Sequence, residues 1–213
     1  MSWTDIPGWY DWQDIYARAV ADAPRDRPSV MVEVGVAFGR SLAHLARLAI
    51  DSGKPITVYG VDPWVDDWNP DWSRDETRRP TWGAEHAEWA RTQGGPFSAF
   101  IKMMQTHAPD ELEFVKVVRA RGVDLAAMLR ANVDLPHLVW IDGDHRYEGV
   151  VADLRSWAWR TGVDEMVFRP RWFGGHDYTP DFPGVQRAVR EAFGDLPAIG
   201  ASWLLAPSYE AAK

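Results

Sequence analysis

The sequence predicts an α/β fold built on a doubly wound, mostly parallel sheet of seven strands. Short apolar, β-branched runs alternate along the chain with segments of helical period, which is the pattern of successive βαβ units. The first unit consists of a strand at 30–34, a glycine-containing turn, a helix near 41–49 and a second strand at 56–61. This connection requires parallel strands and a right-handed crossover.

An N-terminal helix is predicted to precede the first strand. The spacing of one buried helical face is shared by Trp12, Ile15, Tyr16, Ala19 and Val20. We expect this helix to end before Pro24 and assign residues 1–28 to an N-terminal cover. At 213 residues the chain is long enough for one domain with a substantial core, so we expect a single domain over residues 1–213.

Residues 65–95 are predicted to form an insertion that covers the substrate. The segment has no strand period, and a loop of this length in a compact domain is usually functional or disordered. Disordered segments are poor in aromatic residues. This segment carries Trp68, Trp72, Trp82 and Trp89. We therefore expect an ordered aromatic cap with a short helix near 84–91.

The rest of the chain continues the alternation. Further helices are predicted near 96–107, 123–131, 147–159 and 184–193. Further strands are predicted at 113–118, at 138–141, within 165–173 and near 198–205. The sequence leaves the boundaries of the strand within 165–173 open.

The composition excludes several classes of site. The chain has no Cys, so disulfides, thiolate nucleophiles and Cys-ligated zinc are excluded, and any metal must bind oxygen and imidazole ligands. A net charge of -8 disfavours broad nucleic-acid binding, although a local basic patch such as Arg78-Arg79 stays open. Because no apolar run has membrane-spanning length and residues 1–5 lack signal-peptide features, we expect a cytoplasmic protein with a small-molecule substrate.

Carboxylates and imidazoles follow two of the predicted strands. Asp142 and His145 come directly after the strand at 138–141, and His176 and Asp177 follow the next apolar run. Ligands of open α/β sheets bind at the carboxyl ends of the strands. The sequence therefore predicts a site for a metal or for proton transfer at this edge.

The first strand-to-helix turn has features of a different ligand. Gly35 and Gly39 are spaced G-x-x-x-G, so the dinucleotide fingerprint is not met and a pyrophosphate is disfavoured. Glu33 adds a negative charge, which suits a cationic ligand. Asp62, at the end of the second strand, is placed to accept hydrogen bonds from ribose hydroxyls.

In the order and spacing of its motifs the chain resembles the class I S-adenosylmethionine-dependent methyltransferases. Within them it is most similar to small-molecule O-methyltransferases of the catechol and macrolide-sugar types. The resemblance rests on Glu33-x-Gly35-x-x-x-Gly39-x-Ser41, Gly60-Val61-Asp62-Pro63-Trp64, Ile141-Asp142-Gly143-Asp144-His145-x-Tyr147-Glu148, Gly174-Gly175-His176-Asp177-Tyr178 and Pro183-Gly184-Val185-x-x-Ala188-Val189. These motifs span roughly residues 29–205. Each motif alone is weak, but their order is specific and implies a Rossmann-like methyltransferase fold.

The resemblance implies S-adenosylmethionine as cofactor. Residues 33–39 would lie against its methionine part, Asp62 would hold the ribose, and residues 120–122 would lie beside the adenine. The full cofactor set implied is Glu33, Gly35, Gly39, Ser41, Asp62, Pro63, Arg121, Gly122 and Asp142.

The implied reaction is methyl transfer to a hydroxyl of a small molecule, which is a sugar, a phenol or a natural product. The hydroxyl is activated by a general base or by a divalent ion. We predict His145 as the base, because an unperturbed His titrates near pH 6.5, and Asp142 as a second catalytic residue. In metal-dependent members the ligands follow the fourth and fifth strands, which correspond here to Asp142, His176 and Asp177. Oxygen ligands suit Mg²⁺, whereas an imidazole favours Mn²⁺ or Fe²⁺.

Plainer interpretations stay open at each position. Asp62 could cap the next segment, and Asp144 could cap a helix that begins near His145. Asp142 could accept backbone hydrogen bonds, and His176 could be a core residue. The N-terminal aromatics could cover the acceptor, pack in the core or form a homodimer contact; they are Trp3, Trp9, Tyr10 and Trp12.

Two functional alternatives also remain. The chain could be an inactive S-adenosylmethionine-binding or scaffold protein, or a nicotinamide-dependent oxidoreductase, which the missing glycine disfavours. One departure from the resemblance concerns the fifth strand. The family usually carries a Pro-Gly-Gly turn before it, whereas here the Gly-Gly directly precedes His176. This departure leaves open whether Asp177 faces the same pocket as Asp142.

Overall fold

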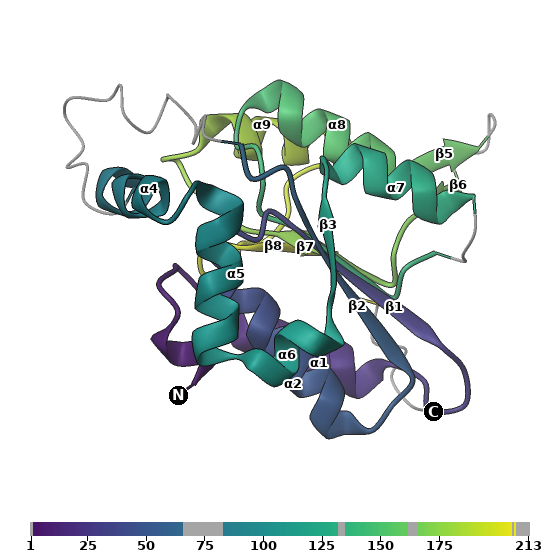
Figure 1. The fold of residues 1–213 in the computed structure, drawn as a ribbon. Coiled ribbons are helices and arrows are strands. Elements are labelled where there is room, and N and C mark those ends of the chain that lie inside the picture. The colour runs from purple at the N-terminus through teal and green to yellow at the C-terminus, as the bar shows by residue number, and fades with distance from the viewer. Residues whose placement is uncertain (1, 66–82, 132–134, 162–165, 206, 208–213) are drawn as a thin grey trace.

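A six-stranded sheet lies between two layers of helices in the computed structural model, which describes residues 2–65, 83–131, 135–161, 166–205 and 207 (Figure 1). The strand order is β3-β2-β1-β4-β7-β8. The strands are β1 (Ser29–Val34), β2 (Ile56–Asp62), β3 (Lys116–Arg119), β4 (Leu138–Ile141), β7 (Trp172–Gly175) and β8 (Trp203–Leu205). All neighbours are parallel except β7 and β8. The predicted doubly wound, mostly parallel sheet is confirmed, with six strands in place of seven.

The helices divide between the two faces of the sheet (Figure 1). One face is covered by α7 (Gly122–Arg130), α8 (Tyr147–Trp157) and α9 (Pro183–Phe193). The other is covered by α1 (Gln13–Asp22), α2 (Arg40–Ser52), α5 (Pro96–His107) and α6 (Pro109–Phe114), with the short 3-10 helix η1 (Trp3–Asp5) beside them.

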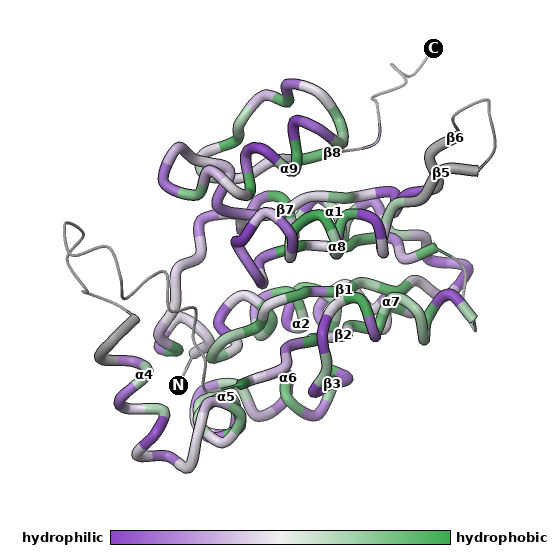
Figure 2. The backbone as a smooth tube through the Cα atoms, turned by 90° about the horizontal axis from the view of Figure 1, so that it is seen from above, coloured by the Kyte–Doolittle hydropathy of each residue, from purple (hydrophilic) through white to green (hydrophobic). Residues whose placement is uncertain are grey.

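Strand β4 shows how the sheet joins the two apolar cores. Leu138 and Trp140 belong to the core under α1 and α2, whereas Val139 and Ile141 belong to the core under α7, α8 and α9. This alternation follows from the two-residue period of a strand. In Figure 2 the central strand β1 is largely in the hydrophobic colour, while the peripheral helix α4 (Gly83–Thr92) carries much of the hydrophilic colour.

The predicted strand at 113–118 was wrong at its start. Residues Pro109–Phe114 form α6, and β3 begins only at Lys116. Pro109 stands at the first helical turn, where its missing N–H costs nothing, and Asp110 and Glu111 complement the positive end of the helix. These helix-start signals outweighed the apolar residues that follow them.

The fifth strand of the sheet lies at the end of the range 165–173, within which the sequence left its boundaries open. Met166–Phe168 form β6, which pairs antiparallel with β5 (Trp159–Thr161) in a hairpin outside the main sheet. The helix predicted over 147–159 therefore ends at Trp157. The strand next to β4 is β7, so Gly174 and Gly175 lie within it and not in a turn before it.

Close packing explains the two glycines in β7. A Cβ at Gly174 would lie 2.7 Å from the carbonyl oxygen of Trp203, and one at Gly175 would lie 2.4 Å from the carbonyl oxygen of Ile141. The final strand is also shorter than predicted, since β8 covers only Trp203–Leu205, with an isolated bridge between Ile199 and Ser202 before it.

The described part of the predicted cap is α4, which confirms the helix expected near 84–91. Trp89 and His86 of α4 pack against Phe38 in the loop after β1, with ring centroids 5.5 and 5.7 Å apart from it. Trp68, Trp72 and Trp82 lie outside the described residues.

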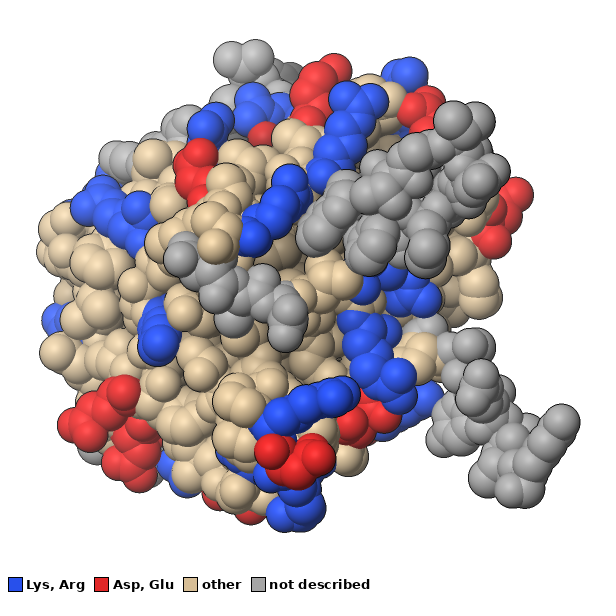
Figure 3. Space-filling view, turned by 90° about the vertical axis from the view of Figure 1, so that its right-hand side faces the viewer, with Lys and Arg blue, Asp and Glu red and all other residues tan. Residues whose placement is uncertain are grey.

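The outer surface carries charges of both signs. Figure 3 shows basic and acidic side chains interspersed over the face at the β5–β6 end of the molecule. None of the helices in the described ranges combines the length and the apolar character that crossing a membrane requires.

Candidate active site

The loops that follow β1 and β4 are in direct contact at the carboxyl edge of the sheet. Gly35 has φ +85°, and a Cβ there would lie 2.0 Å from the carbonyl oxygen of Asp142. The backbone N–H of Asp142 donates to Val34 over 2.7 Å, and that of Gly35 donates to Val61 over 2.9 Å. Only glycine allows the two backbones to come this close. The contact joins the predicted cofactor turn after β1 to the acidic loop after β4.

Asp62 ties the cofactor turn to the end of β2. Its Oδ2 accepts hydrogen bonds from the backbone N–H groups of Val36 and Ala37 at 2.9 and 3.1 Å, and its Oδ1 accepts from Trp64 at 2.7 Å. Burial raises the pKa of Asp62, and these three hydrogen bonds oppose the rise. Asp62 therefore caps the segment that follows it, as the plainer interpretation proposed. It also lies at the predicted ribose site, and its contact with the ribose stays a prediction.

Glu33 is fully buried beneath the same turn. The Tyr16 hydroxyl donates to its Oε2 at 2.7 Å, and the Ser41 hydroxyl donates to its Oε1 at 2.8 Å. Burial raises the pKa of Glu33 to about 8 against these two hydrogen bonds, and the charges of Asp142 and Asp62 add to the rise. Glu33 and Ser41 thus form a buried polar network with α1 and α2, and their contact with a cofactor stays a prediction.

Replacing Glu33 with glutamine is expected to flatten the pH dependence of stability. Because the folded pKa of about 8 exceeds the ordinary value of 4.5, Glu33 stabilises the fold below pH 4.5, and this contribution is lost as the pH rises through 8. The loss is on the order of 5 kcal/mol. Urea unfolding across this pH range measures it. Parallel curves for wild type and Glu33→Gln would show that Glu33 is not the titrating group.

The second glycine of the turn has a different neighbour. Gly39 has φ +95° and forms the N-cap of α2, and a Cβ there would lie 2.7 Å from Sδ of Met104 and 2.9 Å from the ring of Phe100. Its missing side chain therefore makes room for α5. The predicted contact between Gly39 and the cofactor stays untested by this geometry.

The residues predicted to lie beside the adenine, 120–122, stand at the start of α7. Gly122 is its first residue, and a Cβ there would lie 2.5 Å from Oδ1 of Asp153 and 2.6 Å from Cγ1 of Val34. Arg121 is exposed and pairs with Asp124 at 3.1 Å. Pro63 directly follows β2 at the carboxyl edge of the sheet. Its carbonyl oxygen accepts a hydrogen bond from Nε of Arg119 at 3.4 Å.

Four predicted catalytic and metal-binding residues converge beside this edge. Nε2 of His145 lies 2.7 Å from Oδ2 of Asp177 and 3.6 Å from Oδ1 of Asp142. Nδ1 of His176 lies 3.1 Å from Oδ1 of Asp177 and 3.9 Å from Oδ1 of Asp142. Asp177 therefore does face the same site as Asp142. We call Asp142, His145, His176 and Asp177 the acid–imidazole cluster.

Charge compensation dominates the cluster. Burial lowers the pKa of His145, but the hydrogen bonds and charges of Asp142 and Asp177 outweigh burial and raise it to about 10. The same carboxylates raise the pKa of His176 against burial. Burial would raise the pKa of Asp177, yet the two imidazoles hold it well below its usual range. Burial raises the pKa of Asp142. The His145 imidazole is thus positively charged at neutral pH in this state.

The cluster offers a ligand set for a cation. Asp142, His145 and Asp177 each contribute a potential ligand atom, and these atoms lie within 4.8 Å of one another. Two carboxylates and an imidazole fit a divalent ion. A cavity of about 10 Å³ lies among Asp142, His145, His176 and Trp203. This cavity volume is close to the space that one water molecule needs. The cavity therefore has the size of an ion and is too small for an acceptor substrate.

Neighbouring segments bear on the plainer interpretations. Asp144 accepts from the backbone N–H of Arg146 at 2.9 Å, and Arg146, not Asp144, is the N-cap of α8. The ring of Phe182 packs against His145 with centroids 4.9 Å apart. His145 therefore lies before the helix, inside the cluster.

Two residues of the N-terminal segment reach the cluster, and one of them, Asp11, was not predicted to do so. Oδ1 of Asp11 lies 3.2 Å from Nε2 of His176, and the ring of Trp12 packs on the same imidazole. Trp12 and Tyr10 are buried, as the core-packing alternative proposed, whereas Trp9 is 72% exposed. No spacing rule joins positions so far apart in a single sequence.

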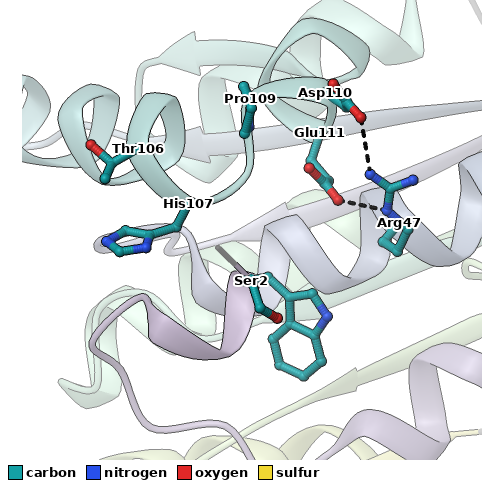
Figure 4. A pocket seen from close by; sticks show the side chains of 8 residues that line it. Ser2, Arg47, Thr106, His107, Pro109, Asp110 and Glu111 are labelled. Atoms are coloured by element: carbon teal, nitrogen blue, oxygen red, sulfur yellow. Dashed lines mark hydrogen bonds and ion pairs between the residues drawn. The ribbon is translucent and has the colours of Figure 1, made fainter.

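A larger cavity of about 440 Å³ lies elsewhere, between η1 and the corner of α5 and α6 (Figure 4). Arg47 crosses it and pairs with Glu111 at 2.6 Å and with Asp110 at 3.5 Å. It contains none of the predicted site residues. Its polar wall is occupied by these ion pairs.

Together, the doubly wound sheet with an antiparallel last strand, the glycine turn after β1 and the acidic end of β2 define the class I S-adenosylmethionine-dependent methyltransferases. The family model described as a methyltransferase domain matches residues 32–164. This is more than half of the chain, so the chain belongs to that methyltransferase family. The predicted class is confirmed, and the family match argues against the oxidoreductase alternative.

Solved structures share this fold. The calicheamicin methyltransferase CalS11 is 22% identical, with a TM-score of 0.58, and the match covers 91% of this chain and 76% of that chain. The O-methyltransferase NovP is 18% identical, with a TM-score of 0.56 and coverages of 92% and 78%. Cofactor-bound Rv0187 from MTB is 17% identical, with a TM-score of 0.51 and coverages of 95% and 84%. No curated protein matches the chain.

Proposed function

We propose that this methyltransferase transfers the methyl group of S-adenosylmethionine to a hydroxyl oxygen of a small molecule at the acid–imidazole cluster. The observation that carries the proposal is the position of His145. Its Nε2 lies 2.7 Å from Asp177 and 3.6 Å from Asp142. The loop that carries His145 also contains Asp142, whose backbone is in contact with Gly35 of the cofactor turn. An imidazole that accepts a proton once it is neutral thus adjoins the turn that the cofactor needs.

The chain's residues have two tasks in such a reaction. S-adenosylmethionine supplies an electrophilic methyl group on a sulfonium, so the protein must align the acceptor oxygen with it and remove the hydroxyl proton. The loops at Gly35 and Asp142 fix the alignment, since their backbones are in contact. His145 is the residue that receives the proton, at Nε2.

A divalent cation belongs to the same proposal. Asp142, Asp177 and Nδ1 of His176 would hold it, with His176 in place of the His145 imidazole that receives the proton, and it would lower the pKa of the acceptor hydroxyl. The imidazole in this set favours Mn²⁺ or Fe²⁺ over Mg²⁺. A cation bound there would also compensate the two carboxylates that raise the pKa of His145, and a neutral His145 imidazole would then accept the proton.

The acceptor is proposed to be a sugar, a phenol or a related natural product. The similar protein CalS11 is described as a TDP-rhamnose 3'-O-methyltransferase, with 19% identity and a TM-score of 0.52, which supports a hydroxyl acceptor. The exposed Trp9 and the outer face of helix α4 are the proposed acceptor contacts, because Trp9 is 72% exposed and α4 packs on Phe38 in the loop after β1.

Turnover is expected with oxygen acceptors and should depend on a cation. The assay offers methyl-labelled S-adenosylmethionine with nucleotide sugars, simple sugars and phenols to protein that was treated with EDTA and then supplied with Mn²⁺ or Mg²⁺. Product is expected only after the ion is restored. Full activity without an ion would exclude the cation. Cofactor binding by calorimetry with no transfer to any hydroxyl would favour the inactive scaffold alternative.

A further inference from the structure

His176 has a carboxylate near each of its ring nitrogens. Nδ1 faces Asp177 at 3.1 Å and Asp142 at 3.9 Å, inside the acid–imidazole cluster. Nε2 points the other way and lies 3.2 Å from Oδ1 of Asp11, in the segment before α1. The imidazole is buried, whereas the Asp11 side chain is 44% exposed. One carboxylate thus approaches His176 from outside the cluster.

The ring plane of His176 is fixed by the same segment. Trp12 packs on the imidazole with centroids 4.5 Å apart and an interplanar angle of 41°. Trp12 is itself stacked on Trp140 of β4, at 5.4 Å and 25°. The indole is therefore held by the sheet, and the imidazole has little freedom to rotate about its own axis.

Histidines that bind metals usually donate their other ring N–H to a carboxylate or carbonyl, which fixes the tautomer and the ring orientation. The arrangement around His176 has this form, with Nε2 toward a carboxylate and Nδ1 toward the two proposed ligand carboxylates. Asp11 lies outside the methyltransferase family match, which begins at residue 32.

We propose that Asp11 is a positioning residue that accepts the Nε2 proton of His176 and so presents Nδ1 to Asp142 and Asp177. The inference rests on the proposed function, because Nδ1 is the third donor of the proposed cation site. It makes the N-terminal segment a part of the active site and not only a cover over it.

The first test measures Mn²⁺ alone, by electron paramagnetic resonance on EDTA-treated protein without cofactor. Asp11→Ala is expected to weaken Mn²⁺ binding about 10- to 100-fold. Asp11→Asn should lose less, since its amide oxygen still accepts from Nε2. Asp14→Ala is the matched control, because Asp14 is an exposed carboxylate in the first turn of α1. Affinity for S-adenosylhomocysteine should not change. Wild-type Mn²⁺ affinity in Asp11→Ala would overturn the inference.

The second test needs no metal. Nitrogen-15 NMR of labelled histidine side chains, recorded where His176 is neutral and assigned with His176→Gln, reports which ring nitrogen carries the proton. The fraction of Nε2–H is expected to be larger in wild type and Asp11→Asn than in Asp11→Ala, because Asp177 near Nδ1 favours Nδ1–H once the Asp11 carboxylate is removed. An unchanged tautomer would overturn the inference. If wild type binds no Mn²⁺, the proposed cation is lost, and this spectrum still decides the role of Asp11. Asp11→Ser, whose hydroxyl is too short to reach, replaces the alanine variant if that variant does not fold.

Discussion

Replacing Gly35 with alanine is expected to destabilise the chain by roughly 4 kcal/mol or more, a size reached only by severe lesions. The left-handed backbone at φ +85° alone costs a non-glycine residue roughly 1–2 kcal/mol. The new Cβ would also lie 2.0 Å from the Asp142 carbonyl oxygen and 2.6 Å from Cα of Gly143. Both obstacles are backbone atoms, so the two loops must separate. Urea unfolding measures the loss, and cofactor affinity should fall with it.

Gly53→Ala is the matched control for this effect. Gly53 also has a left-handed backbone, at φ +61°, but a Cβ there would meet no atom within 4 Å. It ends α2 and is far from the cluster in sequence. The control variant should lose only the conformational term of roughly 1–2 kcal/mol. Equal losses for the two variants would mean that loop contact at Gly35 contributes nothing.

His145→Gln is expected to lower kcat by about 10²- to 10⁴-fold, the usual contribution of a general base. Glutamine retains hydrogen-bonding groups near Asp177 but cannot accept a proton at neutral pH. Cofactor affinity should stay close to that of wild type, because the contact between Gly35 and Asp142 is made by the backbone. Single-turnover rates together with calorimetric titration of S-adenosylhomocysteine separate the two quantities.

His137→Gln provides the comparison for that loss. His137 is also buried and lies 3.5 Å from a carboxylate, that of Asp22, but it stands just before β4, at the opposite end from His145. The substitution should cost stability without lowering kcat at a temperature where the variant is folded. A similar fall in kcat for both variants would show that His145 acts through folding and not through proton transfer.

The strands and helices with strong local patterns could be predicted from the sequence. Helix α5 and strand β4 have the predicted bounds, since Pro96 opens the helix and a fully apolar run defines the strand. The errors fall where local signals compete. At 109–114 helix-start residues outweighed apolar ones. Within 165–173 the sequence left the strand boundaries open, and there Met166–Phe168 formed a hairpin strand while Trp172–Gly175 entered the sheet.

The candidate site was predicted in part for a similar reason. Motifs at strand ends must meet at one edge of a parallel sheet, which is why Asp142, His145 and Asp177 were found together. The contact of Asp11 with His176 depends on how the N-terminal segment packs. The burial of Glu33 under Tyr16 depends on the same packing. No local period encodes such contacts.

The tight packing of β7 against its neighbours fixes the proposed catalytic residues in place, whereas recognition of the acceptor depends on other elements. Gly174 and Gly175 leave no space for a sliding register, so the strand that carries His176 and Asp177 is anchored by main-chain atoms of β4 and β8. Variation among acceptors must then arise in elements that do not share this anchoring, such as α4 and the segment around Trp9. Engineers who wish to redirect the enzyme to new acceptors would keep the proposed reaction centre, which is rigid, and diversify these outer elements.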